Sequence, residues 1–486
     1  MKDFIVGKKK WILTALFAVG IAVVVLPVIA ACGYTYLCED DFSFEGAARD
    51  LVLNYGNIYV GAAHRMAEYY KTNQGTFLFN YLMSALMMYS RGGLPLFHLF
   101  MIIVSAAFFL SLFHLIRIIA KDITAAMGIF LALCVTFFGM INTYAGREVF
   151  LWYTGMLNFL VEFTLSLLAV SFSILYIRTS RMRYAVAGMI LGFFASGGAL
   201  NVTASNVGWL LAVLILTFPA VRDKKLSTLP FAGAFTGAMI NAVAPGNFNR
   251  LGGEVAPLYV GLKNTFLACL SDEKYLLGSW VFWAAMIAVF LICVYMKTDV
   301  ISGGVNAATV VVVLAGTCLV RFFTMFPLAY ANNADHVLKL GMRMMSSYEI
   351  VAKMSYVLFT AVLAQWMRKI LEKKVYYVAL GAAAIGLLTL AITFPATKEQ
   401  VKESMTGSLL SDFRNGSIRE SYTAREYVIT SLELAEDGTD VVIYVPEFRL
   451  AESMYGMGLG GEPQDWVNIS AAGLFRLNSV SVVYSE

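Results

Sequence analysis

The sequence predicts an all-α polytopic membrane protein with a small α/β unit at its C-terminal end. Of its 486 residues, 59% are hydrophobic and only 14% are charged, and the mean hydropathy is +0.71. Soluble globular chains carry about a quarter charged residues, so this composition indicates a membrane protein. The 39 glycines among many aliphatic residues favour helices packed through small side chains over a β-barrel.

Apolar stretches long enough to cross a bilayer recur along the chain, and we expect about eleven transmembrane helices of roughly 20 residues each. The expected spans are residues 11–31, 94–116, 123–143, 153–177, 184–200, 203–221, 226–244, 279–296, 305–327, 349–367 and 375–394. The apolar segment 77–90 is too short to span, and we expect it to form a helix at the membrane interface.

Basic residues follow alternate expected spans and therefore predict the orientation. The clusters are Lys8, Lys9 and Lys10; Arg117 and Lys121; Arg178, Arg181 and Arg183; Arg222, Lys224 and Lys225; Lys297; and Arg368, Lys369, Lys373 and Lys374. Because such residues concentrate in cytoplasmic loops, we expect a multi-pass plasma-membrane protein with a cytoplasmic N-terminus and an extracytoplasmic C-terminus.

This topology predicts two domains. Residues 1–394 would form the transmembrane domain, including an external loop at 32–93 with interfacial helices. Residues 395–486 would form a small extracytoplasmic α/β domain, with a helix in "REYVITSLELAEDG" and strands in "DVVIYVP" and "SVSVVYS". Cys32 and Cys38 flank the end of the first span and could form a disulfide, but we expect free thiols.

Three carboxylates follow the first span in "LCEDDFSFEG": Glu39, Asp40 and Asp41. A carboxylate beside hydrocarbon is costly unless water, a partner or a function holds it there. One of these acids could be a general base that takes a proton from an acceptor hydroxyl. The alternative is a helix cap formed by Asp41 or Ser43.

The second expected external loop, "TYAGREVFLWYTGMLN", places Arg147 and Glu148 beside Trp152 and Tyr153. Glu148 could assist the first acids or help them hold a divalent cation, and Arg147 could pair with a phosphate. The alternative is an Arg–Glu surface pair that contributes little, next to aromatic residues of the membrane interface.

Further cations lie near the expected outer ends of the spans. Arg321 lies inside span nine, Lys339 and Arg343 precede span ten, and Arg250 ends the turn "NAVAPGNFNR". At that depth a lipid-linked phosphate is the anion that an arginine would meet. Anchoring to lipid headgroups is the alternative for each.

Polar residues also occur inside the expected spans. Glu162 lies within span four, and Asn201 and Asn206 lie near the turn between spans five and six. An intramembrane acid suggests a function, while a hydrogen bond from a Ser, Thr or Tyr is an equally good interpretation. Glu349 and Lys353 have the spacing of a structural i,i+4 pair.

Taken in order, these motifs resemble the multi-pass GT-C glycosyltransferases, and the chain is similar to uncharacterised bacterial membrane families of that superfamily. The motifs are the acid pair Asp40–Asp41, "AEYYKTNQGTFLFNYL", "WYTGMLNF", "APGNFNR" and a late arginine before a span. The second motif matches only in part, because Asn73 and Thr76 stand where Trp and Arg are usual. The resemblance covers most of the chain from the first to the tenth expected span, residues 11–367.

The resemblance implies transfer of a sugar from a polyprenyl-phosphate donor to a glycan, lipid or protein acceptor of the cell envelope, on the outer face of the membrane. It implies that Asp41 or Asp40 is the general base and that Glu148 is an auxiliary acid. It places the donor phosphate at Arg343, Arg321, Arg250 and Arg147, and the substrates at Trp152, Tyr153, Asn158, Gln74 and Asn247. A divalent cation (Mg²⁺ or Mn²⁺) is the cofactor that the acids could hold, membrane lipids are expected partners, and no nucleic acid is expected.

Two other functions fit the same composition. One is a transporter or flippase of lipid-linked glycans, and the other is an enzyme similar to O-antigen ligases or polymerases. Transporters usually place polar groups near the bilayer midplane and are built from repeated halves. In this sequence the polar motifs gather at the expected outer ends of the spans and no repeat is visible, which favours the enzyme.

Overall fold

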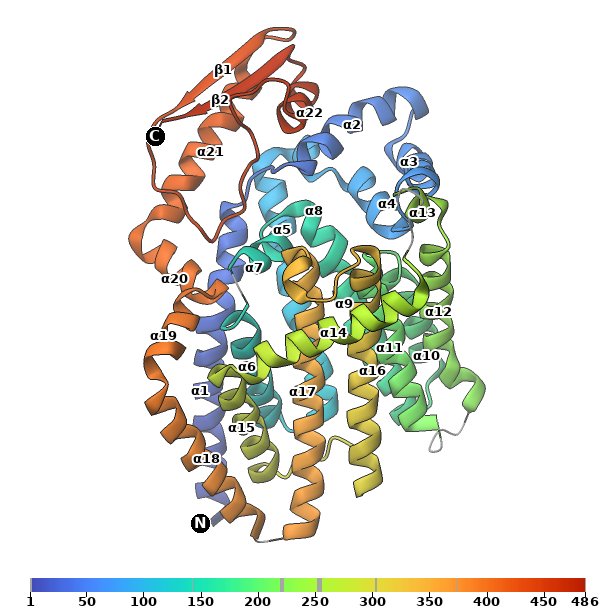
Figure 1. Cartoon of the computed structure of the whole chain (residues 1–486), viewed down its shortest axis with the longest axis vertical. Helices are drawn as coiled ribbons and strands as arrows, with labels where there is room; N and C mark the ends of the chain where they lie inside the picture. The colour runs from blue at the N-terminus through green and yellow to red at the C-terminus, as the bar shows by residue number, and fades with distance from the viewer. Residues whose placement is uncertain are drawn as a thin grey trace.

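The computed structural model describes residues 2–141, 143–218, 223–250, 256–301, 304–372 and 374–485. Arg222 and Lys373, two residues used to predict the orientation, lie outside these ranges. The chain is 79% helical, with a small parallel two-stranded sheet near the C-terminus. Long helices stand side by side, and the C-terminal unit covers one end of them (Figure 1).

The structure has the following elements. In the first half these are α1 (Lys2–Ala31), η1 (Cys32–Tyr34), α2 (Asp40–Tyr55), α3 (Ile58–Thr72), α4 (Phe77–Leu86), α5 (Met88–Ala120), α6 (Ile123–Phe138), α7 (Thr143–Phe150), α8 (Tyr153–Gly155), the π-turn η2 (Met156–Leu160), α9 (Val161–Thr179), α10 (Met182–Ala195), α11 (Leu200–Thr217) and α12 (Lys224–Ala242). In the second half they are α13 (Pro245–Arg250), α14 (Leu258–Leu277), α15 (Trp280–Tyr295), α16 (Ala307–Ala331), η4 (Val337–Lys339), α17 (Met342–Leu371), α18 (Lys374–Ile392), α19 (Phe394–Lys402), α20 (Met405–Asn415), α21 (Ser417–Leu434), β1 (Asp440–Val445), α22 (Trp466–Phe475) and β2 (Ser479–Tyr484).

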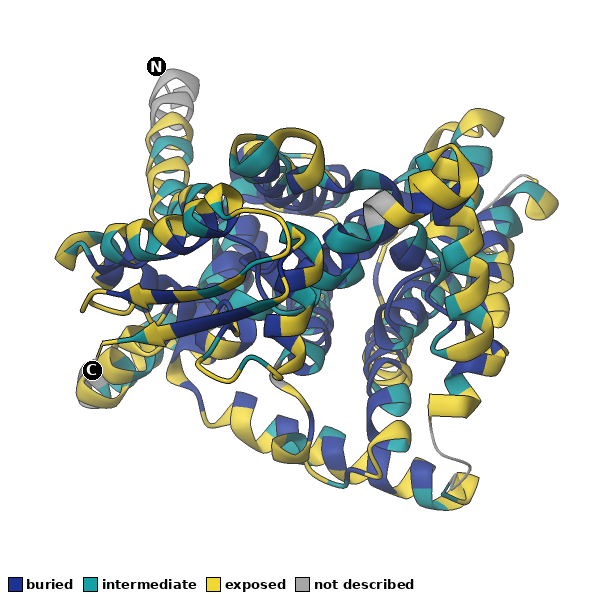
Figure 2. Cartoon of the chain, turned by 90° about the horizontal axis from the view of Figure 1, so that it is seen from above, coloured by how far each residue is buried: buried dark blue, intermediate teal, exposed yellow. Residues whose placement is uncertain are grey.

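Six helices of the described chain are long and apolar enough to cross a membrane, which supports a multi-pass membrane protein. These candidate spans are Lys10–Tyr34, Met88–Ala120, Tyr153–Thr179, Leu200–Thr217, Ala307–Ala331 and Arg343–Leu371. A seventh results if α14 and α15, which are bent by 79° at their junction, are counted as one broken span. Seen from above, the exposed residues lie mostly on the outer sides of the helices (Figure 2).

The sequence predicts about eleven spans, and the structure supports six or seven of them. Two of the other four fall on α6 and α10, which have only 16 and 14 residues. A third falls on α18, whose apolar part is also short, and the fourth falls on α12, which begins with two lysines. A hydropathy window counts apolar residues that lie beyond a helix end, so it overestimates the span. The orientation remains a prediction.

Glycines bring helices α10 and α12 into close contact, as the composition predicts. A Cβ atom at Gly233 would clash with the backbone of Met189, and one at Gly237 would clash with the Phe193 carbonyl oxygen. Glycine at these positions therefore lets the two backbones approach directly, which is the usual way that membrane helices associate.

The first loop forms helices, as predicted. The segment after η1 folds into α2, α3 and α4, and α4 confirms a short helix in the 77–90 segment. Met87 then ends α4 in the left-handed conformation, and α5 follows with a kink at Gly92 and Gly93. Cys32 and Cys38 are both buried free thiols, as expected.

The C-terminal unit confirms the predicted helix and two strands. α21 precedes β1, and β2 pairs with β1 in parallel. The segment from residue 396 to 420, which is polar in sequence, forms helices α19 and α20 rather than an extended linker. One continuous hydrophobic core joins the C-terminal unit to the long helices; for example, Tyr34 makes edge contacts with Phe413 and Tyr422. The unit is therefore fixed on the helical bundle.

Candidate functional site

Segments that are far apart in the sequence meet where the C-terminal unit covers the bundle. The N-terminal turn of α2 supplies Asp40, α7 supplies Glu148, and Trp152 follows α7. Arg343 comes from the first turn of α17. We call these four residues the Arg343 site.

Asp41 is fully buried and ties α2 to α8. Its carboxylate accepts hydrogen bonds from the Cys38 N–H at 3.0 Å, from the Thr154 N–H at 3.0 Å and from the Thr154 hydroxyl at 2.6 Å. Burial raises its pKa well above the usual range, although these hydrogen bonds oppose the shift. Because its oxygens are occupied by protein donors, Asp41 is better suited to hold the site together than to take a proton from a substrate.

Asp40 is only partly buried and lies within electrostatic reach of two arginines. Burial raises its pKa, and the charges of Arg343 and Arg250 oppose this shift. These arginines belong to α17 and α13, which are far apart in the sequence. Asp40 is therefore the acid of the pair that faces cations at a partly accessible position.

Glu148 is also partly buried, and burial raises its pKa. The charge of Arg343, a hydrogen bond from the Arg343 backbone and the charge of Arg147 oppose the shift. Arg343 therefore acts on both Asp40 and Glu148, as expected from the order of the motifs. Because Arg343 lies near two acids, a phosphate can pair with it only by displacing one of them or where one of them is protonated.

An aromatic pair forms one wall of the Arg343 site. The Arg343 guanidinium lies 5.3 Å from the centre of the Trp152 ring, and Tyr455 stacks on Trp152 with ring centres 4.9 Å apart. The Trp152 indole donates to the Cys38 carbonyl oxygen at 3.3 Å, and the Tyr455 hydroxyl donates to Glu39 at 3.0 Å. Tyr455 is a residue that the sequence did not single out, because no motif surrounds it.

Two predicted site residues have other roles in the structure. Arg147 donates to the carbonyl oxygens of Glu452 and Met454, at 2.8 and 3.2 Å, and so holds the C-terminal segment. Tyr153 is buried against Phe97, with ring centres 5.2 Å apart. The structure therefore gives Arg147 a packing role and places Tyr153 in the core.

The "NQGT" and "APGNFNR" motifs meet beside the site. The Arg250 guanidinium donates to the Gln74 side chain at 3.0 Å, and the Asn247 side chain accepts from the Gly75 N–H at 2.9 Å. A Cβ atom at Gly75 would clash with the Asn241 carbonyl oxygen, so glycine is required for this approach. Arg250 is exposed and remains available to an anion.

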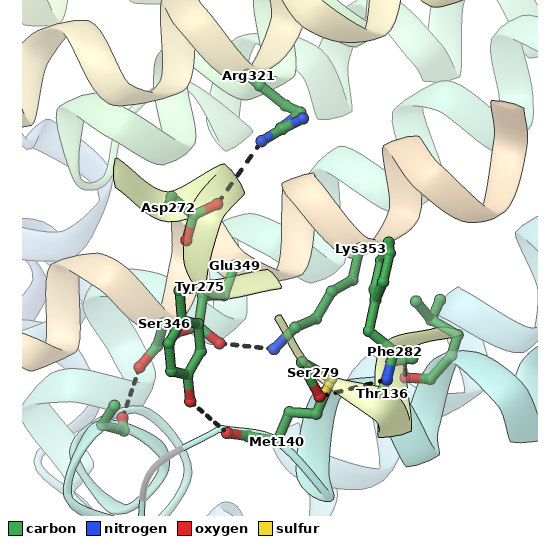
Figure 3. A network of polar contacts seen from close by, with 12 residues as sticks. Thr136, Met140, Asp272, Tyr275, Ser279, Phe282, Arg321, Ser346, Glu349 and Lys353 are labelled. Carbon is green, nitrogen blue, oxygen red and sulfur yellow. Dashed lines mark hydrogen bonds and ion pairs between the residues drawn. The ribbon is translucent and has the colours of Figure 1, made fainter. Parts of the chain in front are cut away.

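Arg321, which was predicted to bind the donor phosphate, lies instead in a separate buried network (Figure 3). It forms ion pairs with Asp272 and Glu273 of α14, 3.6 Å from the Asp272 carboxylate, and donates to the Tyr348 hydroxyl at 3.2 Å. The sequence analysis missed Asp272 and Glu273, because their partner is distant in the chain. With two acids already paired to it, Arg321 is a poor phosphate ligand.

The expected Glu349–Lys353 pair is present in the same region, with 2.6 Å between the ammonium nitrogen and the carboxylate oxygen (Figure 3). Lys353 is completely buried, so this pair stabilises α17 within the bundle.

In the parts of the chain that the structure describes, no group of three or more His, Cys, Asp or Glu side chains is suited to hold a metal ion.

Asn158 contacts the turn between α10 and α11 through its backbone. Its backbone carbonyl oxygen accepts from the Ala199 N–H at 3.3 Å, which places it at the turn between α10 and α11. Asn201, which follows this turn, donates to the backbone carbonyl oxygen of Met344 at 3.2 Å, so the turn lies near the start of α17.

No protein-family model matches the chain, and no curated protein matches its sequence.

Proposed function

We propose that the chain is a membrane glycosyltransferase of the GT-C type. It would transfer a sugar from a polyprenyl-phosphate donor to an acceptor hydroxyl of a cell-envelope glycan, lipid or protein, on the outer face of the membrane. The observation that carries this proposal is the position of Arg343, whose charge acts on both Asp40 and Glu148 at one end of a multi-pass helical bundle.

The residues of the site suit the chemistry of this transfer. The acceptor oxygen bonds to the anomeric carbon, the bond from that carbon to the phosphate oxygen breaks, and the hydroxyl proton passes to a base. Asp40 takes the proton, since it is partly exposed and its raised pKa makes it a stronger base than an ordinary carboxylate. Arg343 and Arg250 stabilise the negative charge that develops on the leaving phosphate.

The other acids have supporting roles in this mechanism. Asp41 fixes the N-terminus of α2 through its hydrogen bonds to Cys38 and Thr154, so that Asp40 is held in position. Glu148 orients Arg343 through the hydrogen bond from the Arg343 backbone. Preorganised charges of this kind lose little free energy to reorganisation during the reaction.

The test is transfer by the purified full-length protein with a polyprenyl-phosphate sugar and an envelope acceptor, measured as released polyprenyl phosphate. We expect Asp40→Asn to abolish release and Arg343→Ala to reduce it strongly. Matched controls are Glu68→Gln and Lys339→Ala, which change an exposed acid and an exposed cation. Full activity of Asp40→Asn, in protein that folds normally, would exclude Asp40 as the base.

A second function, transport of a lipid-linked glycan, is favoured by the buried charges of Arg321 and Lys353 within candidate spans. Charged groups buried within membrane spans are typical of transporters. Proteoliposomes separate the two functions: movement of a labelled lipid-linked glycan between leaflets without sugar release would support the transporter and contradict the enzyme.

A further inference from the structure

The α8–α9 region contains a buried acid that the proposed transfer mechanism does not use. Glu162 lies in the first turn of α9, directly after the π-turn η2, and its exposed fraction is 0%. π-turns within helices often occur at functional sites. Apart from its own backbone N–H, no group in the described ranges hydrogen-bonds to either carboxylate oxygen.

The Glu162 side chain packs directly against the turn between α10 and α11. A Cβ atom at Gly198 would lie 2.6 Å from a Glu162 carboxylate oxygen, so only glycine leaves room for the acid. The backbone of the next residue, Ala199, donates to the Asn158 carbonyl oxygen at 3.3 Å. Asn158 precedes Glu162 by four residues, so the two side chains lie near each other along the same helical stretch.

Asn241 of α12 contacts the same turn. Its amide nitrogen donates to the carbonyl oxygens of Gly198 and Ser196, at 2.8 and 3.1 Å, and to the Thr203 hydroxyl at 3.2 Å. These three acceptors fix the orientation of the amide, and its side-chain oxygen is buried without a donor among the residues described.

The unsatisfied atoms of these side chains are all oxygen acceptors. They are both carboxylate oxygens of Glu162 and the side-chain oxygens of Asn158, Asn241 and Asn206. Asn206 contacts the same region, because its amide nitrogen donates to the Ser196 hydroxyl at 3.0 Å. Buried acceptors without donors are costly, and a buried carboxylate without a counter-charge is more costly still.

A bound cation accounts for this arrangement better than a proton. A proton on Glu162 would supply one donor and leave most of these acceptors unsatisfied, whereas a hard cation takes several oxygen ligands at once. The single carboxylate balances one positive charge, so a divalent ion would leave net charge in a region of low dielectric constant. Asn158 is partly exposed, while its side-chain oxygen is buried.

We propose that Glu162, Asn158 and Asn241 bind a small monovalent cation, with Na⁺ as the ion that suits carboxylate and amide oxygens. The cation connects the π-turn at the start of α9 to the α10–α11 turn and to α12. The proposed ligands are not residues of the Arg343 site, so the proposal does not depend on the sugar-transfer function.

The test measures thermal unfolding of the purified full-length protein in NaCl and in choline chloride at equal ionic strength. We expect Na⁺ to raise the Tm saturably, because a ligand that binds only the folded state stabilises it. Glu162→Gln should remove the Na⁺-dependent rise. Asn158→Ala, which keeps the carboxylate and changes a partly exposed residue, should raise the half-saturating Na⁺ concentration by about tenfold.

Glu45→Gln is the matched control, because Glu45 is also buried but accepts hydrogen bonds from the N–H groups of Tyr89 and Ser90. This variant should keep the Na⁺-dependent rise in Tm, whatever its effect on basal stability. The proposal is overturned if wild-type Tm is the same in both salts, or if Asn158→Ala and Glu162→Gln both respond to Na⁺ like the wild type. An infrared carboxylic-acid band present in Na⁺ and lost in Glu162→Gln would show a protonated acid and also overturn it.

Discussion

Replacing Asp41 by alanine should destabilise the protein strongly, because it leaves three buried donors without an acceptor. These donors are the Cys38 N–H, the Thr154 N–H and the Thr154 hydroxyl. Each unsatisfied buried donor costs about 1–3 kcal/mol of stability. Removing the buried carboxylate offsets part of this cost, because its own desolvation is avoided. We therefore expect a net loss of roughly 2–4 kcal/mol in the free energy of unfolding. Asp41→Asn keeps an oxygen for Thr154 and should cost less, about 1–2 kcal/mol.

The assay is equilibrium or thermal unfolding of purified protein in one detergent, followed by tryptophan fluorescence. The control is Asp437→Ala, which removes an exposed acid whose ion pair with Arg476 is long, at 3.4 Å.

The pH dependence provides a second measurement. The pKa of Asp41 is raised in the folded state. The stability that this carboxyl group contributes is therefore fully present below about pH 4, its pKa in the unfolded chain, and is lost as the pH rises through its pKa in the folded state. Asp41→Asn should remove this part of the pH dependence. Equal stabilities of Asp41→Ala and Asp437→Ala would refute the reasoning.

Three further predictions follow from the structure. Arg321→Met should lower the free energy of unfolding by about 3–5 kcal/mol, because it leaves the buried Asp272 and the partly buried Glu273 without their counter-charge; a Tm equal to that of the wild type would contradict the ion-pair network. Gly75→Ala should cost at least about 1–3 kcal/mol, since its Cβ would meet the Asn241 carbonyl oxygen and the backbone has to move; this is measured by denaturant unfolding. The rate of sugar transfer, measured as kcat/KM, should rise with pH through the raised pKa of Asp40 and then level off, because the base acts when deprotonated; a rate that falls across this range would exclude the base role.

The fold could be predicted from sequence where hydrophobicity alone decides it. α16, and α5 beyond its kink at Gly92 and Gly93, are long and apolar, so a hydropathy window locates them. At α10 the hydropathy window extends the expected span past the end of the helix into a turn that contains Gly197 and Gly198. A hydropathy scale gives glycine the same value in a turn as in a helix, so it does not detect this end. Helix ends depend on backbone conformation, which composition does not record.

The order of the motifs predicted that Asp40, Glu148 and Arg343 belong together, and the structure places them at one site. The sequence could not distinguish Asp40 from Asp41, because adjacent residues of a helix point about 100° apart and only the packing decides which is buried. It also could not show that Arg321 is already paired, since Asp272 and Glu273 reach it through the packing of α14 against α16.

The contact of Tyr455 with Trp152 and Glu39 has a consequence for biogenesis. The ribosome makes the start of α2 and the α7–α8 junction early, yet one wall of their site comes from a segment that is synthesised near the end of the chain. A nascent protein therefore carries an unfinished site until translation is almost over. A chain that ends between Arg343 and Tyr455 would carry the other residues of the site but would lack that wall.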